Sequence, residues 1–513
     1  MKKVRTLLFI PLVLGMLVGC NKDIDPVPVA SSENQPLNMS GSEYLLDFYS
    51  INDLHGSVVE NKDVSNPEDR EAGMSKIGSF IRNKRNQNLG GSFFISNGDA
   101  YQGSADSNIT GGKIVMEMFN LLDFEVNTVG NHEFDWSIQT LLANMSEMDV
   151  KYPLLACNII NKALTAQTAI NSYVDWAEPY KIIERGTGQD KVKVGIIGSI
   201  AYGLENSIAA SMVRDFAFLE PTARVIELAS ELRNDQDCDV IIYATHGDAG
   251  TSGKGATVNT NIANYVDAIF TGHAHRYWDT PLTNSLGNPV PVLQGRSNGK
   301  AMSYVQLAVD KMTRAVRAVN HEVLDYDDLK AFGNDPSIDS VYNRWYKDVI
   351  QVVKNRKVGS VSREISKDTI SGFLADEMLR FGISHDSTVV AAFHNGTGGI
   401  RDVLRKGNIT FGDIYKVLPF DNSLYFVTVQ GFYITGGTFA LLNGTRGSTV
   451  DGTTFLPSAF YRIVLLSYVA EHTSVNMDGS DPSRARDVEI VDKYPRDLIA
   501  DAFTNHPSNR PFD

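Results

Sequence analysis

Short apolar runs rich in Val, Ile and Phe recur through the first part of the chain. Each run has the length and the β-branched composition of a buried strand. The runs cover residues 45–51, 91–96, 124–129, 191–199, 239–245, 265–271, 289–294 and 303–309. Stretches with helical spacing separate some of them, notably residues 73–81 and 222–233. This alternation predicts an α/β domain, whose ligand-binding edge lies at the carboxyl ends of its strands.

A charged amphipathic helix is predicted over residues 335–357, because Ile338, Val341 and Trp345 recur there at helical intervals. We interpret this helix as the connection between two domains, and a chain of 513 residues is long enough for both. The expected boundaries are residues 43–332 for the first domain, 333–357 for the linker helix and 358–513 for a smaller second domain.

The first residues have the composition of an export signal. Basic residues precede an apolar run that is too short to span a membrane and that ends at Cys20 in the tetrapeptide Leu-Val-Gly-Cys. This ending resembles the lipobox of bacterial lipoproteins, which implies cleavage of residues 1–19 and a lipid on Cys20. The expected location is the cell envelope, at a periplasmic or outer surface. An ordinary signal peptide is the alternative. Residues 20–42 are polar and are predicted to be a flexible tether.

The charge of the chain narrows the class of molecule that it is expected to bind. The formal net charge is −14 and no block of Lys and Arg occurs, which argues against nucleic-acid polymers. Small phosphorylated ligands stay compatible with this charge, because bound cations can invert the local field.

Besides Cys20, the chain has only Cys157 and Cys238, both in apolar strand-like surroundings where we expect small buried residues. A disulfide between them is the alternative in an oxidising compartment.

Polar residues with metal-ligand chemistry follow five of the predicted strands. Asp53 and His55 come after the first strand, and their spacing puts both side chains on one face. Asp99 follows the second. The other three segments end in Asn131 and His132, in His246, and in His273 and His275. A lone histidine of this kind is more often structural, but five such strand ends together favour a metal site.

In this order, the five segments resemble the calcineurin-like metallophosphoesterases, and the second domain narrows the likeness to the 5′-nucleotidase family. The resemblance runs from about Tyr44 onward. It implies a four-layer αββα sandwich, a smaller α+β domain and two divalent metal ions, zinc or manganese before iron or magnesium. By motif, one ion is held by Asp53, His55, Asp99 and His275, and the other by Asp99, Asn131, His246 and His273. Family members often carry Gln or Asn in place of His275, and an imidazole there favours zinc over magnesium.

The resemblance also implies a catalytic pair, in which Asp135 orients His132. Two cations roughly 3.5 to 4 Å apart would acidify a bridging water for attack on phosphorus. A protonated His132 would then neutralise charge on the transferred phosphoryl group or on its leaving oxygen.

Two segments of the second domain resemble substrate-binding loops of the same family. Residues 395–401 combine an asparagine, a glycine turn and an arginine, which suit a phosphate or a carboxylate. Residues 407–422 end in Leu-Pro-Phe-Asp-Asn, a family hallmark whose phenylalanine stacks on a nucleobase. The resulting candidates for substrate binding are Asn395, Gly398, Gly399, Arg401, Phe420 and, as a second ring, Tyr468.

The chain departs from the family pattern around the second ring. Residues 465–474 lack the Gly-Gly-Asp-Gly that normally follows it, and residues 442–461 are shorter than the family segment and show no clear strand. An additional phosphate-binding arginine has no counterpart near residues 363–367. These departures weaken the expectation of a nucleoside monophosphate more than that of phosphoester hydrolysis.

Two functions from different classes follow. The first is a lipid-anchored, two-metal phosphohydrolase that releases phosphate from extracytoplasmic nucleotides, with a UDP-sugar hydrolase or a 2′,3′-cyclic-nucleotide phosphodiesterase as alternatives within that class. The second is a nucleotide-binding lipoprotein with impaired turnover. The complete set of metal and catalytic positions favours the enzyme.

Overall fold

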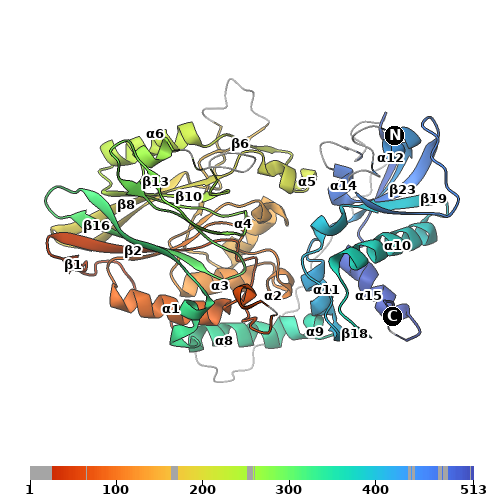
Figure 1. The fold of residues 1–513 in the computed structure, drawn as a ribbon, viewed down its shortest axis with the longest axis horizontal. Coiled ribbons are helices and arrows are strands. Elements are labelled where there is room, and N and C mark those ends of the chain that lie inside the picture. The colour runs from red at the N-terminus through yellow and green to blue at the C-terminus, as the bar shows by residue number, and fades with distance from the viewer. Residues whose placement is uncertain are drawn as a thin grey trace.

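The computed structural model shows two lobes joined by a helical segment along one side (Figure 1). It describes residues 26–64, 66–162, 172–250, 258, 260–436, 441, 445–471, 477, 483–508 and 510–512. The predicted signal segment and Cys20 lie outside these residues. Within the described part of the chain, no helix is both long and apolar enough to cross a membrane.

The first domain is a four-layer sandwich built around two sheets, which confirms the predicted fold class. One sheet contains, in spatial order, β17 (Val316–Leu324), β16 (Met302–Asp310), β2 (Glu43–Ile51), β3 (Ser92–Ser96), β4 (Val126–Thr128) and β5 (Leu154–Leu155). The other contains β12 (Tyr277–Asp279), β15 (Val292–Gly295), β11 (Ala268–Phe270), β10 (Val240–His246), β8 (Asp190–Ile200) and β7 (Tyr180–Thr187). The apolar runs of the sequence therefore become the central strands.

Three apolar layers hold the sandwich together. Phe93 and Phe270 lie in the layer between the sheets and are fully buried. The outer face of the first sheet is covered by α1 (Gly73–Gln87), α3 (Lys113–Leu121) and α8 (Pro336–Trp345), and α6 (Thr222–Asn234) covers the second (Figure 1). Since β2 and β3 are parallel and α1 connects them, the first two apolar runs and the helical stretch between them form a βαβ unit.

Replacing Phe93 with alanine tests the layer between the sheets. Phe93 stacks on Phe48 with ring centroids 4.7 Å apart. We expect Phe93→Ala to lower the free energy of unfolding by about 3–5 kcal/mol, because the cavity cannot refill. Urea unfolding followed by circular dichroism measures the change. Met312→Ala is the control: this side chain is 84% exposed, so its loss should change stability by less than about 0.5 kcal/mol.

Two segments differ from the sequence expectations at their ends. Part of the predicted tether lies against the first domain, because β1 (Met39–Ser40) pairs with β2 and Leu37 is buried. The linker begins with the N-cap Asp335 and Pro336, as its sequence indicates. It continues through a π-helical turn (Tyr346–Ile350) into α9 (Gln351–Lys354), and it ends before residue 357, where β18 (Lys357–Val361) starts.

The second domain is a smaller α+β unit. Its sheet contains β22 (Arg446–Thr449), β19 (Val389–His394), β23 (Phe460–Leu466), β21 (Leu424–Gln430) and β24 (Ala485–Val491). It also contains α10 (Lys367–His385), α11 (Phe411–Val417) and α15 (Pro495–Asn505), and β18 pairs with β20 (Gly407–Thr410). The strand β22 corrects the expectation that residues 442–461 hold no strand: a short polar segment becomes an edge strand by pairing with β19.

Candidate metal centre

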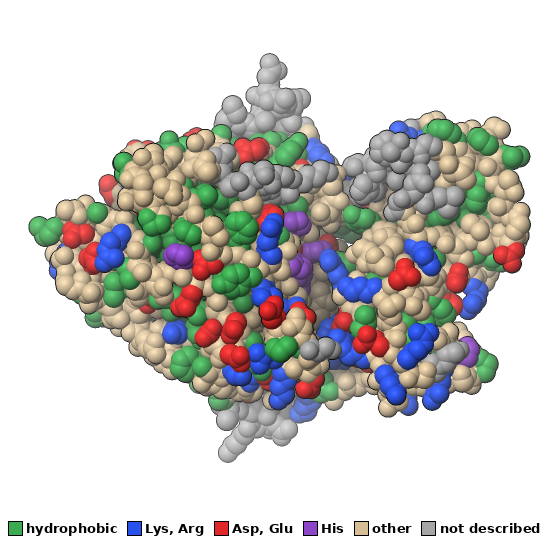
Figure 2. Space-filling model, viewed as in Figure 1, with side chains coloured by type: hydrophobic (Ala, Val, Ile, Leu, Met, Phe, Trp, Pro, Cys, Tyr) green, Lys and Arg blue, Asp and Glu red, His purple; other side chains and the backbone are tan. Residues whose placement is uncertain are grey.

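Seven potential ligands from five loops meet at one point of the first domain. The loops follow β2, β3, β4, β10 and β11, so the carboxyl ends of both sheets contribute. Figure 2 shows histidine side chains in the hollow between the two lobes. Three overlapping groups have their ligand atoms within 4.8 Å of one another: Asp53, His55 and His275; His55, Asp99 and His132; Asp99, His246 and His273.

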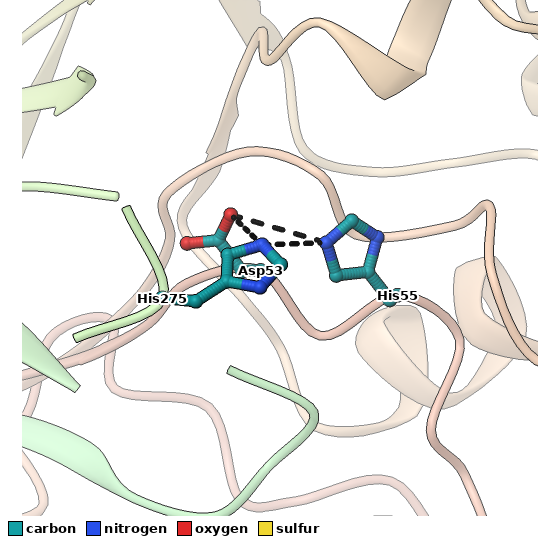
Figure 3. A group of neighbouring side chains, drawn as sticks. All are labelled: Asp53, His55 and His275. Carbon is teal, nitrogen blue, oxygen red and sulfur yellow. Dashed lines mark hydrogen bonds and ion pairs between the residues drawn. The ribbon is translucent and has the colours of Figure 1, made fainter. Parts of the chain in front are cut away.

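The first group is shown in Figure 3, where the three side chains point toward one another. The Nε2 atom of His275 lies 3.2 Å from Asp53 Oδ1 and 3.0 Å from His55 Nε2. The His55 Nε2 atom is 4.0 Å from the same carboxylate oxygen. Two imidazoles and a carboxylate at such spacing are a donor set that suits zinc or another transition metal.

The group of Asp99, His246 and His273 is built around Asp99. Its Oδ2 atom lies 3.2 Å from His246 Nε2 and 3.9 Å from His55 Nε2, so this oxygen faces both groups. The Oδ1 atom of Asn131 is 3.1 Å from His273 Nδ1, which adds an amide oxygen and a further imidazole. A carboxylate between two donor groups is what a paired metal site requires.

The histidines are oriented as metal ligands. The Nδ1 atoms of His55 and His246 hydrogen-bond to backbone carbonyls, of Gln102 at 3.0 Å and of Asn97 at 2.9 Å. These contacts aim both Nε2 atoms into the site, as partners of metal-bound imidazoles do. The Nε2 atom of His246 is buried, and the group nearest to it is the Asp99 carboxylate, whose Oδ2 atom is 3.2 Å away. The residues therefore fit a pair of divalent cations.

The charges of the site agree with this interpretation. Burial, reinforced by His275, lowers the pKa of His55 to about 3, so this imidazole is neutral and can donate a lone pair. Burial opposes ionisation of Asp99, but His246 and His132 outweigh it and hold the pKa of Asp99 well below its usual range. Burial also disfavours a charged His246, yet Asp99 and Asp53 raise its pKa to about 10. The buried carboxylates thus favour positive charge at this point, and bound cations meet the same demand.

The ligand loops are held in a backbone conformation that most side chains avoid. Positive φ values occur at Asp53, His55, Asp99, His273 and His275. Non-glycine residues in this region cost about 1 kcal/mol or more each, and such strain clusters at functional sites. Gly130 is packed against the same loops, because a Cβ there would overlap Asp99 Oδ1.

The predicted catalytic pair lies beside the metal ligands. His132 Nδ1 is 2.7 Å from Asp135 Oδ2, and His132 Nε2 is 4.0 Å from Asp99 Oδ2. Burial lowers the pKa of His132, but Asp135 and Asp99 outweigh burial and raise it above the usual value. The imidazole is therefore biased toward the protonated form that a general acid needs.

The predicted substrate residues share a cavity with these groups. This first cavity has a volume of about 650 Å³, and its walls include Asp99, Asn131, His132, Asn395, Gly398, Arg401, Phe420 and Tyr468. Arg401 Nη2 is 3.3 Å from His132 Nε2, and the Phe420 ring is 5.8 Å from the His132 ring in a stacked arrangement. Gly399 is the exception, since it lines a small neighbouring cavity of about 10 Å³.

A second cavity of about 880 Å³ is also lined by His275. The two cavities have Gln102, His275, Gly398 and Arg401 in common. Trp136, Phe420 and Tyr468 line the first cavity, whereas the described lining of the second contains no Phe, Tyr or Trp. Its walls carry side chains of both charges, among them Lys300, Glu364, Arg405 and Lys416.

Several residues that shape the site were not predicted from the sequence. Gln102 contributes the carbonyl that holds His55 and lines both cavities. Asn52 donates from Nδ2 to Asp53 Oδ2 at 2.7 Å. Glu133 lies inside the Gly-Asn-His-Glu segment, so its position was visible in the sequence although its contacts were not.

Cys157 and Cys238 are both buried and free, which agrees with the expectation of small buried residues and not with a disulfide between them.

Comparison with known proteins agrees with this architecture. The model of the calcineurin-like phosphoesterase family matches residues 46–277, and the model of the 5′-nucleotidase C-terminal domain matches residues 349–437. Endonuclease YhcR of Bacillus subtilis is 24% identical over 504 residues, which cover 88% of this chain and 39% of that protein. Cell wall protein Lmo0130 of Listeria monocytogenes is 25% identical over 483 residues, 82% of this chain and 58% of that protein. The chain thus spans less than two thirds of the length of these relatives.

The fold has a counterpart among solved structures. A 5′-nucleotidase precursor from Thermus thermophilus superposes with a TM-score of 0.67 at 18% identity, covering 90% of this chain and 96% of that one. This likeness shows the fold, and the two family models define a calcineurin-like phosphoesterase. Within that class, the second domain places the chain in the 5′-nucleotidase family, which confirms the resemblance seen in the sequence.

Proposed function

We propose that the protein is a metal-dependent phosphoester hydrolase that removes phosphate from nucleotides. The observation that carries this proposal is the convergence of the three overlapping donor groups, the His132–Asp135 pair and the Phe420 ring at one cavity. When bound, two divalent cations would supply an activated water and would neutralise phosphoryl oxygens. The donors proposed to hold them are Asp53, His55, Asp99, Asn131, His246, His273 and His275.

The side chains around the donors have distinct roles in this proposal. Asp135 keeps the His132 ring oriented, and a proton on His132 Nε2 passes to the leaving oxygen of the substrate. The Arg401 guanidinium lies close enough to His132 for both to reach one anionic group, so it binds the phosphoryl oxygens. Phe420 and Tyr468 provide rings for a nucleobase.

Phosphate release from AMP in the presence of manganese or zinc tests the proposal. The expected result is steady turnover that stops on chelation and returns when metal is restored. A protein that binds two metal ions and AMP but releases no phosphate from any phosphoester would instead be the nucleotide-binding protein with impaired turnover.

Replacing Phe420 with alanine tests how the base is held. Stacking contributes about 1–3 kcal/mol per base, so we expect KM for AMP to rise about 5- to 150-fold. Hydrolysis of ribose 5-phosphate, which has no base, should change little. Phe432→Ala is the matched control, because this ring is in the same domain and is 50% exposed. Equal losses for both substrates would show that Phe420 acts on His132 and not on a base.

The second cavity favours a second candidate function, hydrolysis of phosphodiesters or of the diphosphate bond of sugar nucleotides. Such substrates carry a further substituent on phosphorus, and the second cavity, which shares His275 and Arg401 with the first, offers room for it. Its charged side chains and the absence of aromatic rings from its described lining suit a hydroxyl-rich group. Comparing kcat/KM for AMP, UDP-glucose and cyclic 2′,3′-AMP separates the candidates, and Lys416→Ala should affect only the extended substrate.

We further infer that the protein works in the cell envelope. The leader ending at Cys20 supports this location, and one relative is named a cell wall protein. Mass spectrometry of the mature N-terminus tests the lipid anchor, which is expected on Cys20 and should be lost in Cys20→Ser.

A further inference from the structure

Glu133 has a buried carboxyl group that the proposed chemistry does not use. It lies in the 3-10 turn His132–Phe134, directly after the catalytic histidine, and is only 3% exposed. A buried carboxylate is costly unless hydrogen bonds compensate it, so its contacts indicate what it does.

Both oxygens of this carboxylate accept backbone N–H groups. Oε2 accepts from Asp99 at 2.9 Å and from Gly130 at 2.7 Å, and Oε1 accepts from Ala100 at 2.9 Å. Charge-assisted bonds of this kind are stronger than neutral ones. Glu133 belongs to none of the three potential metal-binding groups among the described residues. Its oxygens are thus committed to the backbone.

These bonds join the two loops that carry the central ligands. The loop after β3 carries Asp99, and the loop after β4 carries Asn131 and Glu133 itself. The connection is reciprocal, because the backbone N–H of His132 donates to Asp99 Oδ1 at 2.8 Å. With Oδ1 held in this way, Oδ2 is the oxygen that faces His246 and His55.

We propose that Glu133 is a positioning residue for the metal centre. It fixes the loop of Asp99, in its strained positive-φ conformation, against the loop of Asn131 and His132. The proposal rests on the proposed function to the extent that Asp99 and Asn131 are metal ligands. Loss of such a supporting contact typically lowers metal affinity or activity 10- to 100-fold.

Metal binding by Glu133→Gln is the first test. Glutamine has nearly the same shape, but its NH2 group faces a backbone N–H and cannot accept from it. We expect a 10- to 100-fold weaker affinity for zinc, measured by calorimetry with purified full-length protein. The rise in melting temperature that zinc produces should shrink in parallel, and excess metal should restore much of kcat.

A matched control separates positioning from stability. Asp267 Oδ2 accepts the backbone N–H of Ile241 at 2.7 Å in the same domain but lines neither cavity. Asp267→Asn should lower the melting temperature while leaving the zinc affinity unchanged. Glu133→Asp provides a second variant if Glu133→Gln does not fold, since it keeps the charge on a shorter arm and should show an intermediate loss of affinity.

The outcomes distinguish this inference from the proposed function. If Glu133→Gln and Glu133→Asp bind zinc as tightly as the unmodified protein, the positioning role is overturned, whatever happens to melting temperature. If the unmodified protein binds zinc but hydrolyses no phosphoester, the proposed function fails while the affinity comparison still tests Glu133.

Discussion

Replacing His132 with alanine is expected to lower kcat for phosphoester hydrolysis by about 10²–10⁴-fold, the usual contribution of a general acid. The imidazole is held by Asp135 and is biased toward its protonated form, so its removal leaves the departing oxygen without a proton donor. Metal content should stay at the unmodified level, because Asp99, His55 and His246 retain their contacts. Phosphate release and metal analysis on the same samples measure both quantities.

His321→Ala is the matched control for this experiment. His321 also pairs with an aspartate, since its Nδ1 atom is 2.6 Å from Asp279 Oδ1, but it lines neither cavity. Its loss should leave kcat unchanged. A His132→Ala enzyme that retains full turnover would remove His132 from the mechanism, and one that loses its metal would make it a ligand instead.

Replacing Asp99 with asparagine is expected to have the largest effect on the centre. Asp99 belongs to two of the three potential metal-binding groups, and its Oδ2 atom faces histidines of both. Asparagine keeps the shape but removes the negative charge, so affinity for both cations should fall together. Without the several kcal/mol that bound cations supply, kcat should fall by about 10³-fold or more. Zinc titration and phosphate release measure the two losses.

Asp47→Asn is the control for the loss of a buried carboxylate. Asp47 is 7% exposed and accepts hydrogen bonds from Tyr304 and Gln306 in the same sheet. We expect this variant to be less stable yet to bind two metal ions. Retention of both ions by Asp99→Asn would refute the shared position that we assign to Asp99.

The central strands and their ligands could be predicted because their signals are local. A β-branched run that ends in Asp, His or Asn is visible in the sequence, and β2, β3 and β10 follow that pattern closely. Parallel pairing of β2 with β3 brings Asp53 and Asp99 to the same edge, which strand order alone predicts. His246 ends β10 in the other sheet, so its approach to Asp99 depends on how the two sheets pack.

Features that depend on partners far away in the chain were not predictable. The strand β22 consists of Arg-Gly-Ser-Thr and has no apolar alternation, so only its pairing with β19 makes it a strand. Leu37 looked like an isolated apolar residue in a polar segment, yet the first domain buries it. The role proposed for Glu133 could not be predicted for a related reason. Two of the backbone N–H groups that donate to its carboxyl oxygens, those of Asp99 and Ala100, lie more than thirty positions earlier in the chain.

The left-handed backbone of the ligand loops has a consequence for protein engineering. Glycine or asparagine would lower the backbone strain at the five positive-φ positions and should raise the melting temperature of the metal-free protein. These positions are Asp53, His55, Asp99, His273 and His275. Directed evolution for heat resistance would therefore enrich replacements at the very positions that we propose as metal ligands, which sets thermal stability against catalysis. Libraries built on this scaffold need those five codons held constant, or a turnover screen in every round.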